Sequence, residues 1–183
     1  DYISGYRMLE KAYREGKVRA IGLSNFTQQE MCRMMNICSI KPAVLQTELH
    51  PYYSEQELKK FLNLQDIRIQ AWYPLGHGDS KLINEPIFTR LAKKYGKTNA
   101  QIILRWHVQE GNIVIPGSKS PEHIRENIDI FDFELTENEM LNIGALDRGE
   151  RYYKRSPERF ERYLNMKICL LYTSDAADEA RSV

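Results

Sequence analysis

Short apolar runs alternate with helical patterns along this chain. The apolar runs predict buried strands at residues 18–23, 43–49, 67–72 and 113–115. Between them, apolar residues three or four positions apart predict helices over 6–15, 55–63, 85–95, 98–109 and 138–145, with further helices beginning at Thr27 and Pro121. Strands that are nearly continuous in apolar residues and joined through helices lie parallel, and we expect both faces of their sheet to be covered. The pattern therefore predicts an α/β fold of four strand–helix units.

Several helix boundaries carry end signals. A hydroxyl residue stands three positions before a glutamate, the spacing of a capping box, in the pairs Thr27 and Glu30, Ser54 and Glu57, and Thr136 and Glu139. Gly16 predicts the end of the first helix. The methionines that share one face of the second helix are Met31, Met34 and Met35. We expect this methionine stripe to fill the core.

The stretch from Ile113 to Asn127 predicts a strand, a turn and a helix. A fully buried strand at 113–115 would end at Pro116 and Gly117, and a polar turn at 118–120 would follow. Ser120 suits an N-cap before Pro121 at the first helical position. The amide groups and positive dipole end of this helix would face the turn, which favours a phosphate. The alternative is an ordinary joint that binds nothing.

Polar and aromatic residues gather where the predicted strands end, the side of a parallel α/β fold that carries function. They are Ser24 and Asn25; Gln46, Glu48 and His50; Trp72 and Tyr73; and Ser118 and Lys119. Gln46 lies within an apolar strand, where a buried amide is costly unless it is hydrogen-bonded. A structural partner could satisfy it, or Gln46 could hold a ligand carboxamide together with Ser24 and Asn25. Trp72 could stack on a ring or pack in the core.

Composition narrows the possible partners. The 183 residues suffice for one domain, and 26 Lys and Arg against 25 Asp and Glu give a net charge of +1, which favours neither a nucleic-acid nor a membrane partner. We find no apolar run of the length that a membrane helix needs, and no leader. The cysteines are Cys32, Cys38 and Cys169. Their odd number and spacing predict free thiols in a reducing compartment, which we take to be the cytoplasm.

Other candidate chemistries find little support in the sequence. The four histidines share no metal-ligand spacing, so no metal is predicted, and His107 is expected to pack on a helix face. The basic and aromatic segment 148–162 also contains glutamates, which favours a solvated segment over a nucleic-acid site. The composition changes near the end of the chain, and residues 171–183 show no periodicity. We therefore separate a domain at 1–168 from a tail at 169–183 that is either foreign sequence or natively disordered.

Four motifs, in this order and at fitting separations, resemble the aldo-keto reductases, including bacterial diketogluconate-reductase-like members. They are Gly16–Phe26, Gln46–Pro51, Ala71–Gly76, and Ile115–Ser120 with Glu126 and Asn127. The resemblance runs from about residue 6 to about residue 167. It implies the C-terminal half, four βα units, of a (β/α)8 barrel that binds NADP(H), or less often NAD(H). Such enzymes reduce aldehydes and ketones to alcohols by hydride transfer.

The resemblance also implies roles for single residues. Ser24, Asn25 and Gln46 would hold the nicotinamide carboxamide, and Trp72 would stack on the nicotinamide ring. The pyrophosphate and ribose path would be lined by Tyr73, Leu75 and Gly76. The adenosine half would be held by Ser118, Lys119 and Ser120 at the 2′-phosphate or ribose, by Glu126 and Asn127 at the adenine, and by His123.

Two positions depart from the family's NADP-binding pattern. Gly117 and His123 stand where a lysine and an arginine are usual, so charge-assisted bonds of about 1.5–3 kcal/mol each would be lost. Lys119 and Arg125 could restore part of this attraction. We therefore expect weakened preference for NADP(H) and a plausible use of NAD(H).

The family's catalytic Asp, Tyr, Lys and His belong to the half of the barrel that this chain does not resemble. No catalytic residue is therefore assigned, and the chain is predicted to be an inactive fragment of a carbonyl reductase. The alternatives are a nucleotide-binding half-barrel without catalysis and a non-functional truncated product. For the whole enzyme we expect a small carbonyl substrate and a monomeric state.

Overall fold

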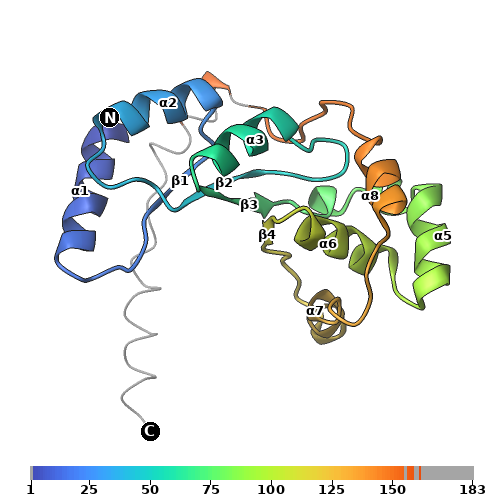
Figure 1. Cartoon of the computed structure of the whole chain (residues 1–183). Helices are drawn as coiled ribbons and strands as arrows, with labels where there is room; N and C mark the ends of the chain where they lie inside the picture. The colour runs from blue at the N-terminus through green and yellow to red at the C-terminus, as the bar shows by residue number, and fades with distance from the viewer. Residues whose placement is uncertain (1, 155, 159–160, 162–183) are drawn as a thin grey trace, which may run out of the picture. The chain divides into compact units, whose positions relative to one another are not determined.

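A computed structural model describes residues 2–154, 156–158 and 161 of the chain (Figure 1). Its sheet has four parallel strands in the order β1-β2-β3-β4. The strands are β1 Gly22–Ser24, β2 Val44–Glu48, β3 Arg68–Trp72 and β4 Ile113–Val114. The predicted α/β class and the parallel direction of the strands are confirmed, and β1 and β4 form the two edges of the sheet.

A helix follows each strand, as the pattern predicted, and one helix precedes β1. The helices are α1 Tyr2–Arg14, α2 Gln28–Ile37, α3 Gln56–Leu64, α5 Pro86–Tyr95, α6 Asn99–Gln109, α7 Pro121–Ile128 and α8 Glu137–Gly144. The sequence reading missed a 3₁₀ turn, Gly76–Gly78, and the short α4, Ser80–Ile83. The side chain of Asp79 accepts a hydrogen bond from the Lys81 backbone N–H, and this local cap fixes α4 within a segment that reads as a loop.

Only one face of the sheet is covered by helices among the described residues, so the expectation of two covered faces was wrong. Leu45 pairs with Ile69, and both are buried under α2 and α3, which lie on the same side of β2 and β3 (Figure 1). Alternate residues of a strand point to opposite faces. Gln46 and Gln70 therefore point the other way, and both remain partly exposed.

Two groups of apolar side chains form most of the core. Met31 from α2 packs with strand residues and with Leu62 from α3, and Met34 is also fully buried, which confirms the core role of the methionine stripe. A second group joins α5 and α6 through Phe88 and Trp106. Burial of such a side chain contributes about 1.5–3 kcal/mol.

Of the N-terminal caps predicted at Thr27, Ser54, Ser120 and Thr136, all but the one at Ser54 are formed. The capping boxes of Thr27 and Thr136 are both formed, and Ser120 caps α7 by accepting from the His123 N–H. The Ser54 capping box is absent, because Ser54 donates its hydroxyl hydrogen to Asp147. Residue 55 caps α3 only through its backbone, in a left-handed conformation.

The edge strands are shorter and more exposed than predicted. Ile113 and Ile115 are 44% and 43% exposed, so the predicted fully buried strand at 113–115 is wrong. At the other edge, β1 begins at Gly22, where pairing with Val44 starts, and Val18 is 38% exposed. An edge strand has a neighbour on one side only, which leaves its side chains less covered.

Other predictions concern the thiols and the end of the chain. Cys32 and Cys38 are free and half-buried, as expected. Cys169, residues 171–183 and the boundary at 168–169 lie outside the described residues. Within the segment 148–162, Arg151 and Tyr152 are half-buried, so this part is not simply solvated. In the described part of the chain, every helix is too short or too polar to cross a membrane.

Candidate functional site

The structure brings the polar residues of three strand ends together. Ser24 and Gln46 are register partners in β1 and β2. The backbone N–H of Asn25 donates to the Gln46 carbonyl oxygen at 2.8 Å, and the Trp72 indole N–H donates to Asn25 Oδ1 at 2.9 Å. The side chain of Asn25 also donates to Ser24 Oγ at 3.3 Å. The four residues predicted to share one site therefore form a connected cluster.

The partner of Gln46 is Gln70. Gln46 Nε2 donates to Gln70 Oε1 at 2.6 Å, across β2 and β3. Gln70 is thus the structural partner that the sequence left open, and it accepts a hydrogen bond from the Gln46 side-chain amide. This bond does not exclude a role of Gln46 in holding a ligand. Because Nε2 is bonded to Gln70, the atom that Gln46 can offer to a ligand is the acceptor Oε1.

Strained backbone conformations mark the ends of β1 and β3. Asn25, Tyr73 and His77 have φ values of 58°, 55° and 57°, in the left-handed region that non-glycine residues rarely adopt. Such residues cost on the order of 1–3 kcal/mol each and cluster at functional sites. Their positions agree with a site at these strand ends.

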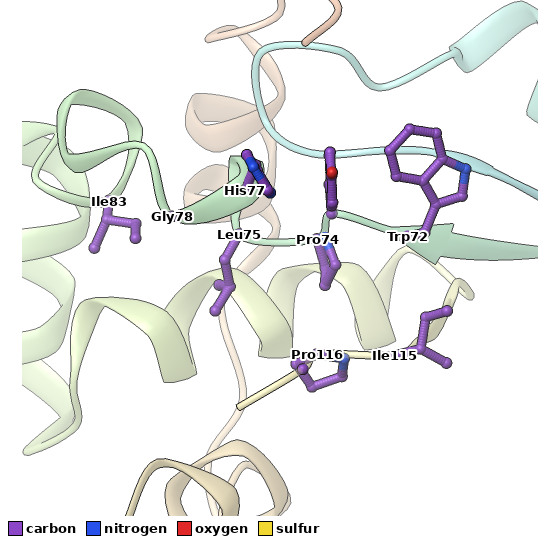
Figure 2. A pocket seen from close by; sticks show the side chains of 10 residues that line it. Trp72, Pro74, Leu75, His77, Gly78, Ile83, Ile115 and Pro116 are labelled. Carbon is purple, nitrogen blue, oxygen red and sulfur yellow. The ribbon is translucent and has the colours of Figure 1, made fainter. Parts of the chain in front are cut away.

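A pocket of about 500 Å³ opens beside this cluster (Figure 2). It is lined by Trp72, Tyr73, Pro74, Leu75, His77, Gly78, Ile83, Ile115, Pro116 and Gly117. Tyr73 meets Trp72 edge-on, with ring centroids 4.4 Å apart, and stacks on His77 at 4.3 Å. The pocket thus joins the end of β3 to the turn after β4, which the sequence assigned to opposite halves of one ligand.

Some lining residues were missed by the sequence reading. His77 and Gly78 belong to the 3₁₀ turn, and Ile83 belongs to α4. Their signal was present, because the polar loop at 77–80 directly follows a predicted strand end. Gly76 was predicted to line the ligand path, but it is buried, next to the pocket rather than in its wall.

The turn before α7 has the predicted form. Ser118 Oγ accepts from the Ser120 N–H at 3.1 Å, which closes the turn. Lys119 and His123 are exposed. Gly117 is also exposed, and no atom of the described residues lies within 4 Å of where its Cβ would stand. A longer side chain would therefore fit at Gly117 without a clash.

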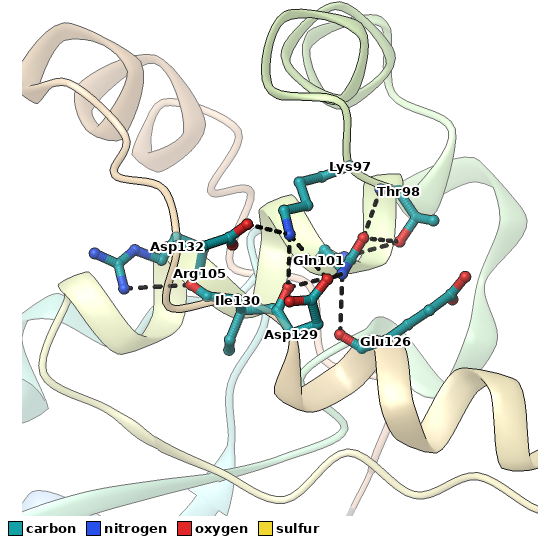
Figure 3. A network of polar contacts seen from close by, with 8 residues as sticks. All are labelled: Lys97, Thr98, Gln101, Arg105, Glu126, Asp129, Ile130 and Asp132. Carbon is teal, nitrogen blue, oxygen red and sulfur yellow. Dashed lines mark hydrogen bonds and ion pairs between the residues drawn. The ribbon is translucent and has the colours of Figure 1, made fainter.

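A polar network anchors α7 to the start of α6 (Figure 3). Gln101 Nε2 donates to the backbone oxygens of Glu126 and Asp129 at 3.2 and 2.8 Å. Lys97 Nζ lies 2.9 Å from Asp129 Oδ2 and 2.8 Å from Asp132 Oδ2. The Lys97 ammonium lowers the pKa of the Asp132 carboxyl. The network fixes the last turn of α7, and with it the half-buried Glu126 and Asn127.

Two polar residues at and just after the end of β2 do not line the pocket. Glu48 and His50 are fully buried, and Glu48 Oε1 lies 3.2 Å from His50 Nε2 and accepts from the Tyr152 N–H at 2.6 Å. Their role is internal. His107 is also fully buried, which confirms its predicted packing, and its Nε2 lies 3.1 Å from the Pro74 carbonyl oxygen. Within the described residues, no cluster of side chains could hold a metal ion.

Comparisons with known proteins agree on one family. The family model described as "Aldo/keto reductase family" matches residues 1–148. The chain is 43% identical over 150 residues to a glyoxal reductase of Bacillus subtilis, covering 82% of this chain and 54% of the relative. It is 39% identical to a 9,11-endoperoxide prostaglandin H2 reductase of Trypanosoma cruzi, covering 82% and 53%. The chain thus spans about half the length of the curated relatives it matches.

Solved structures show the same likeness. An aldo-keto reductase from a Medee basin deep-sea metagenome library superposes with a TM-score of 0.82 at 35% identity, over 84% of this chain and 57% of that one. A Bombyx mori aldo-keto reductase in complex with NADP gives a TM-score of 0.81 at 30% identity, over 87% and 54%. The four βα units therefore correspond to a partial barrel of these structures.

Proposed function

The chain belongs to the aldo/keto reductase family, and we propose that it forms the cofactor-binding half of an NADP(H)-dependent carbonyl reductase. The observation that carries this proposal is the cluster at the ends of β1, β2 and β3. There Asn25 is bonded to Gln46 through its backbone and to Trp72 through its side chain. The pocket of about 500 Å³ adjoins this cluster.

The donor set fits the nicotinamide end of the cofactor. A carboxamide needs both donors and acceptors. The Ser24 hydroxyl and the Asn25 amide can donate, and Gln46 Oε1 can accept while its Nε2 is bonded to Gln70. Trp72 lines the pocket at this end, where a flat apolar ring could lie against a nicotinamide ring.

The turn before α7 fits the adenosine end. Ser118, Lys119 and Ser120 lie ahead of the helix N-terminus, where phosphate oxygens are favoured. Gly117 and His123 supply no fixed positive charge, whereas Lys119 and Arg125 are exposed cations near the same turn. We infer that the 2′-phosphate is held less tightly than a lysine and an arginine would hold it, and that NAD(H) is tolerated.

NADPH, when bound, supplies a hydride to a small aldehyde or ketone. The residues assigned here bind and orient the cofactor, and none of them is placed as the proton donor that an alkoxide needs. General acid catalysis typically contributes about 10²–10⁴-fold. We therefore infer that this chain by itself binds the cofactor but reduces a carbonyl substrate slowly or not at all. We also infer that the complete enzyme is a cytoplasmic monomer.

Fluorescence quenching by NADPH tests the binding. We expect saturable quenching of the full chain, and its loss in Trp72→Phe. Gln46→Ala and Gln70→Ala both remove the Gln46–Gln70 bond, but only Gln46→Ala removes the proposed carboxamide ligand. Gln46→Ala should therefore raise Kd about tenfold, the upper range for one neutral hydrogen bond, while Gln70→Ala should change it little.

Equal effects of the Gln46 and Gln70 substitutions would refute the carboxamide role, and the absence of quenching would refute cofactor binding. Carbonyl-dependent NADPH oxidation by the same chain tests the inferred inactivity. Measurable turnover would show that a proton donor is present in this chain.

A further inference from the structure

The segment after α8 is bound to the loop that follows β2. The backbone N–H groups of Arg148 and Glu150 donate to the Tyr52 carbonyl oxygen at 3.0 and 3.2 Å. The carboxylate of Asp147 accepts from both the backbone and the hydroxyl of Ser54. Residues 147–150 are thus held by several independent bonds, and Tyr152 follows them next to Glu48, at the end of β2.

Tyr152 is bonded at both its backbone and its side chain. Its N–H donates to Glu48 Oε1 at 2.6 Å, and its ring centroid lies 4.7 Å from that of the buried His50. Its hydroxyl donates to Asp79 Oδ2 at 2.7 Å. The backbone bond and the ring contact hold the residue in place. The partner of the hydroxyl is the Asp79 carboxylate, so the hydroxyl can hold Asp79.

Asp79 closes the loop that lines the pocket. Its Oδ1 accepts from the Lys81 N–H at 2.9 Å, and its own N–H donates to the Gly76 carbonyl oxygen at 3.0 Å. His77 and Gly78, which line the pocket, lie between these two anchors. A Cβ at Gly76 would stand 3.1 Å from both Cε2 and the hydroxyl oxygen of Tyr152, so the loop passes directly against this ring.

We propose that Tyr152 is a positioning residue whose hydroxyl holds the loop 76–80 in the shape that forms the pocket wall. The hydroxyl is connected to His77 and Gly78 through Asp79, and Tyr152 itself does not line the pocket. The part of this inference that concerns ligand binding rests on the proposed function, whereas the part that concerns the shape of the loop does not. The consequence is that the hydroxyl affects ligand affinity more than it affects the stability of the fold.

Tyr152→Phe tests this in the full chain, because it keeps the ring packing and the backbone bond to Glu48. Tyr95→Phe is a matched control, since Tyr95 donates its hydroxyl hydrogen to Glu139 Oε2 at 2.6 Å and does not line the pocket. Amide hydrogen exchange of residues 76–83 should speed up about tenfold in Tyr152→Phe, as expected for the loss of a bond to a charged acceptor. The loop exchange should be unchanged in the control.

Ligand affinity gives the second measurement. The Kd for NADPH should rise about tenfold in Tyr152→Phe and stay unchanged in Tyr95→Phe, while the urea midpoints of both variants should shift alike. In an Asp79→Ala background, Tyr152→Phe should have no further effect on loop exchange, because its acceptor is gone.

Unchanged loop exchange in Tyr152→Phe would overturn the proposal, and so would faster exchange with an unaltered Kd. If the unsubstituted chain fails to bind NADPH, the proposed function fails, but the exchange comparison still decides whether the hydroxyl holds the loop. A further effect of Tyr152→Phe in the Asp79→Ala background would show that the hydroxyl acts through another partner, which also contradicts the proposal.

Discussion

Lowering the pH from 7 to 5 should destabilise the fold through one buried histidine, His107. Its ring has no exposed surface. Nε2 lies 3.1 Å from the Pro74 carbonyl oxygen, and Nδ1 lies 3.1 Å from Asn112 Nδ2. With the hydrogen on Nε2, both contacts are hydrogen bonds of a neutral ring. A second proton on Nδ1 would face the amide donor of Asn112 and break that bond.

Burial away from water lowers the pKa of His107 to about 3, from an ordinary value of 6.5. In the unfolded chain, His107 therefore binds a proton near pH 6.5, whereas in the folded chain it stays neutral until the pH approaches 3. This contribution to stability is complete above pH 6.5 and is lost as the pH falls from 6.5 toward 3. At pH 5, about 1.5 units below the ordinary pKa, the loss is about 2 kcal/mol, at about 1.36 kcal/mol per unit.

Urea unfolding of the full chain at pH 7 and pH 5, followed by tryptophan fluorescence, measures this loss. His107→Gln keeps a donor and an acceptor but does not titrate, so it should lose less stability than the unsubstituted chain. The control is His77→Gln, which replaces an exposed histidine. Its free energy of unfolding should fall between pH 7 and pH 5 by about 2 kcal/mol, as in the unsubstituted chain, within the precision of the urea extrapolation. The carboxyls of Asp79 and Asp132 also have lowered pKa values, but their ordinary pKa is below 4. Their contributions to stability are therefore lost mainly below pH 5 and affect this comparison little.

An equal loss in His107→Gln would refute the reasoning. It would mean that the folded chain accepts the proton on His107. The physical route is a rotated Asn112 amide, because Asn112 Oδ1 is buried without a hydrogen-bond partner and could then accept from a protonated Nδ1.

Three further substitutions test packing and cofactor choice. Gly22→Ala should destabilise the fold by about 1–3 kcal/mol in urea unfolding, because its Cβ would stand 2.6 Å from the Val44 backbone oxygen; unaltered stability would show that β1 moves freely. Leu45→Ala should cost about 2–5 kcal/mol by the same assay, since Leu45 is fully buried, and a cost under about 1 kcal/mol would contradict its core position. Gly117→Lys with His123→Arg should increase the preference for NADPH over NADH by about tenfold or more in Kd, and an unchanged ratio would contradict the proposed phosphate position.

Local sequence was sufficient for the elements and most of their ends. The alternation of apolar runs with helical periodicity predicted four parallel strand–helix units, because each period is a property of a few neighbouring residues. Thr27 and Thr136 capped the predicted helices because a capping box joins residues only three positions apart. The residues at the ends of β1 to β3 also met as predicted, since parallel strands place their ends at one edge.

The tertiary structure decided which polar groups are used internally. Ser54 had the spacing of a cap, but its hydroxyl is bonded to Asp147, 93 residues away. Glu48 looked like a site residue, but it accepts from Tyr152, 104 residues away, and is fully buried. No local pattern encodes such partners, because they depend on which loops the complete fold brings together.

The sequence by itself therefore determined the family, the strand order along the chain and the cluster of Ser24, Asn25, Gln46 and Trp72. The tertiary structure decided which sheet face is covered and which loop forms the pocket wall. The physical reason is the range of the interactions. Periodicity and capping act within a few residues, whereas burial and the choice of hydrogen-bond partner depend on chain segments that meet only after folding.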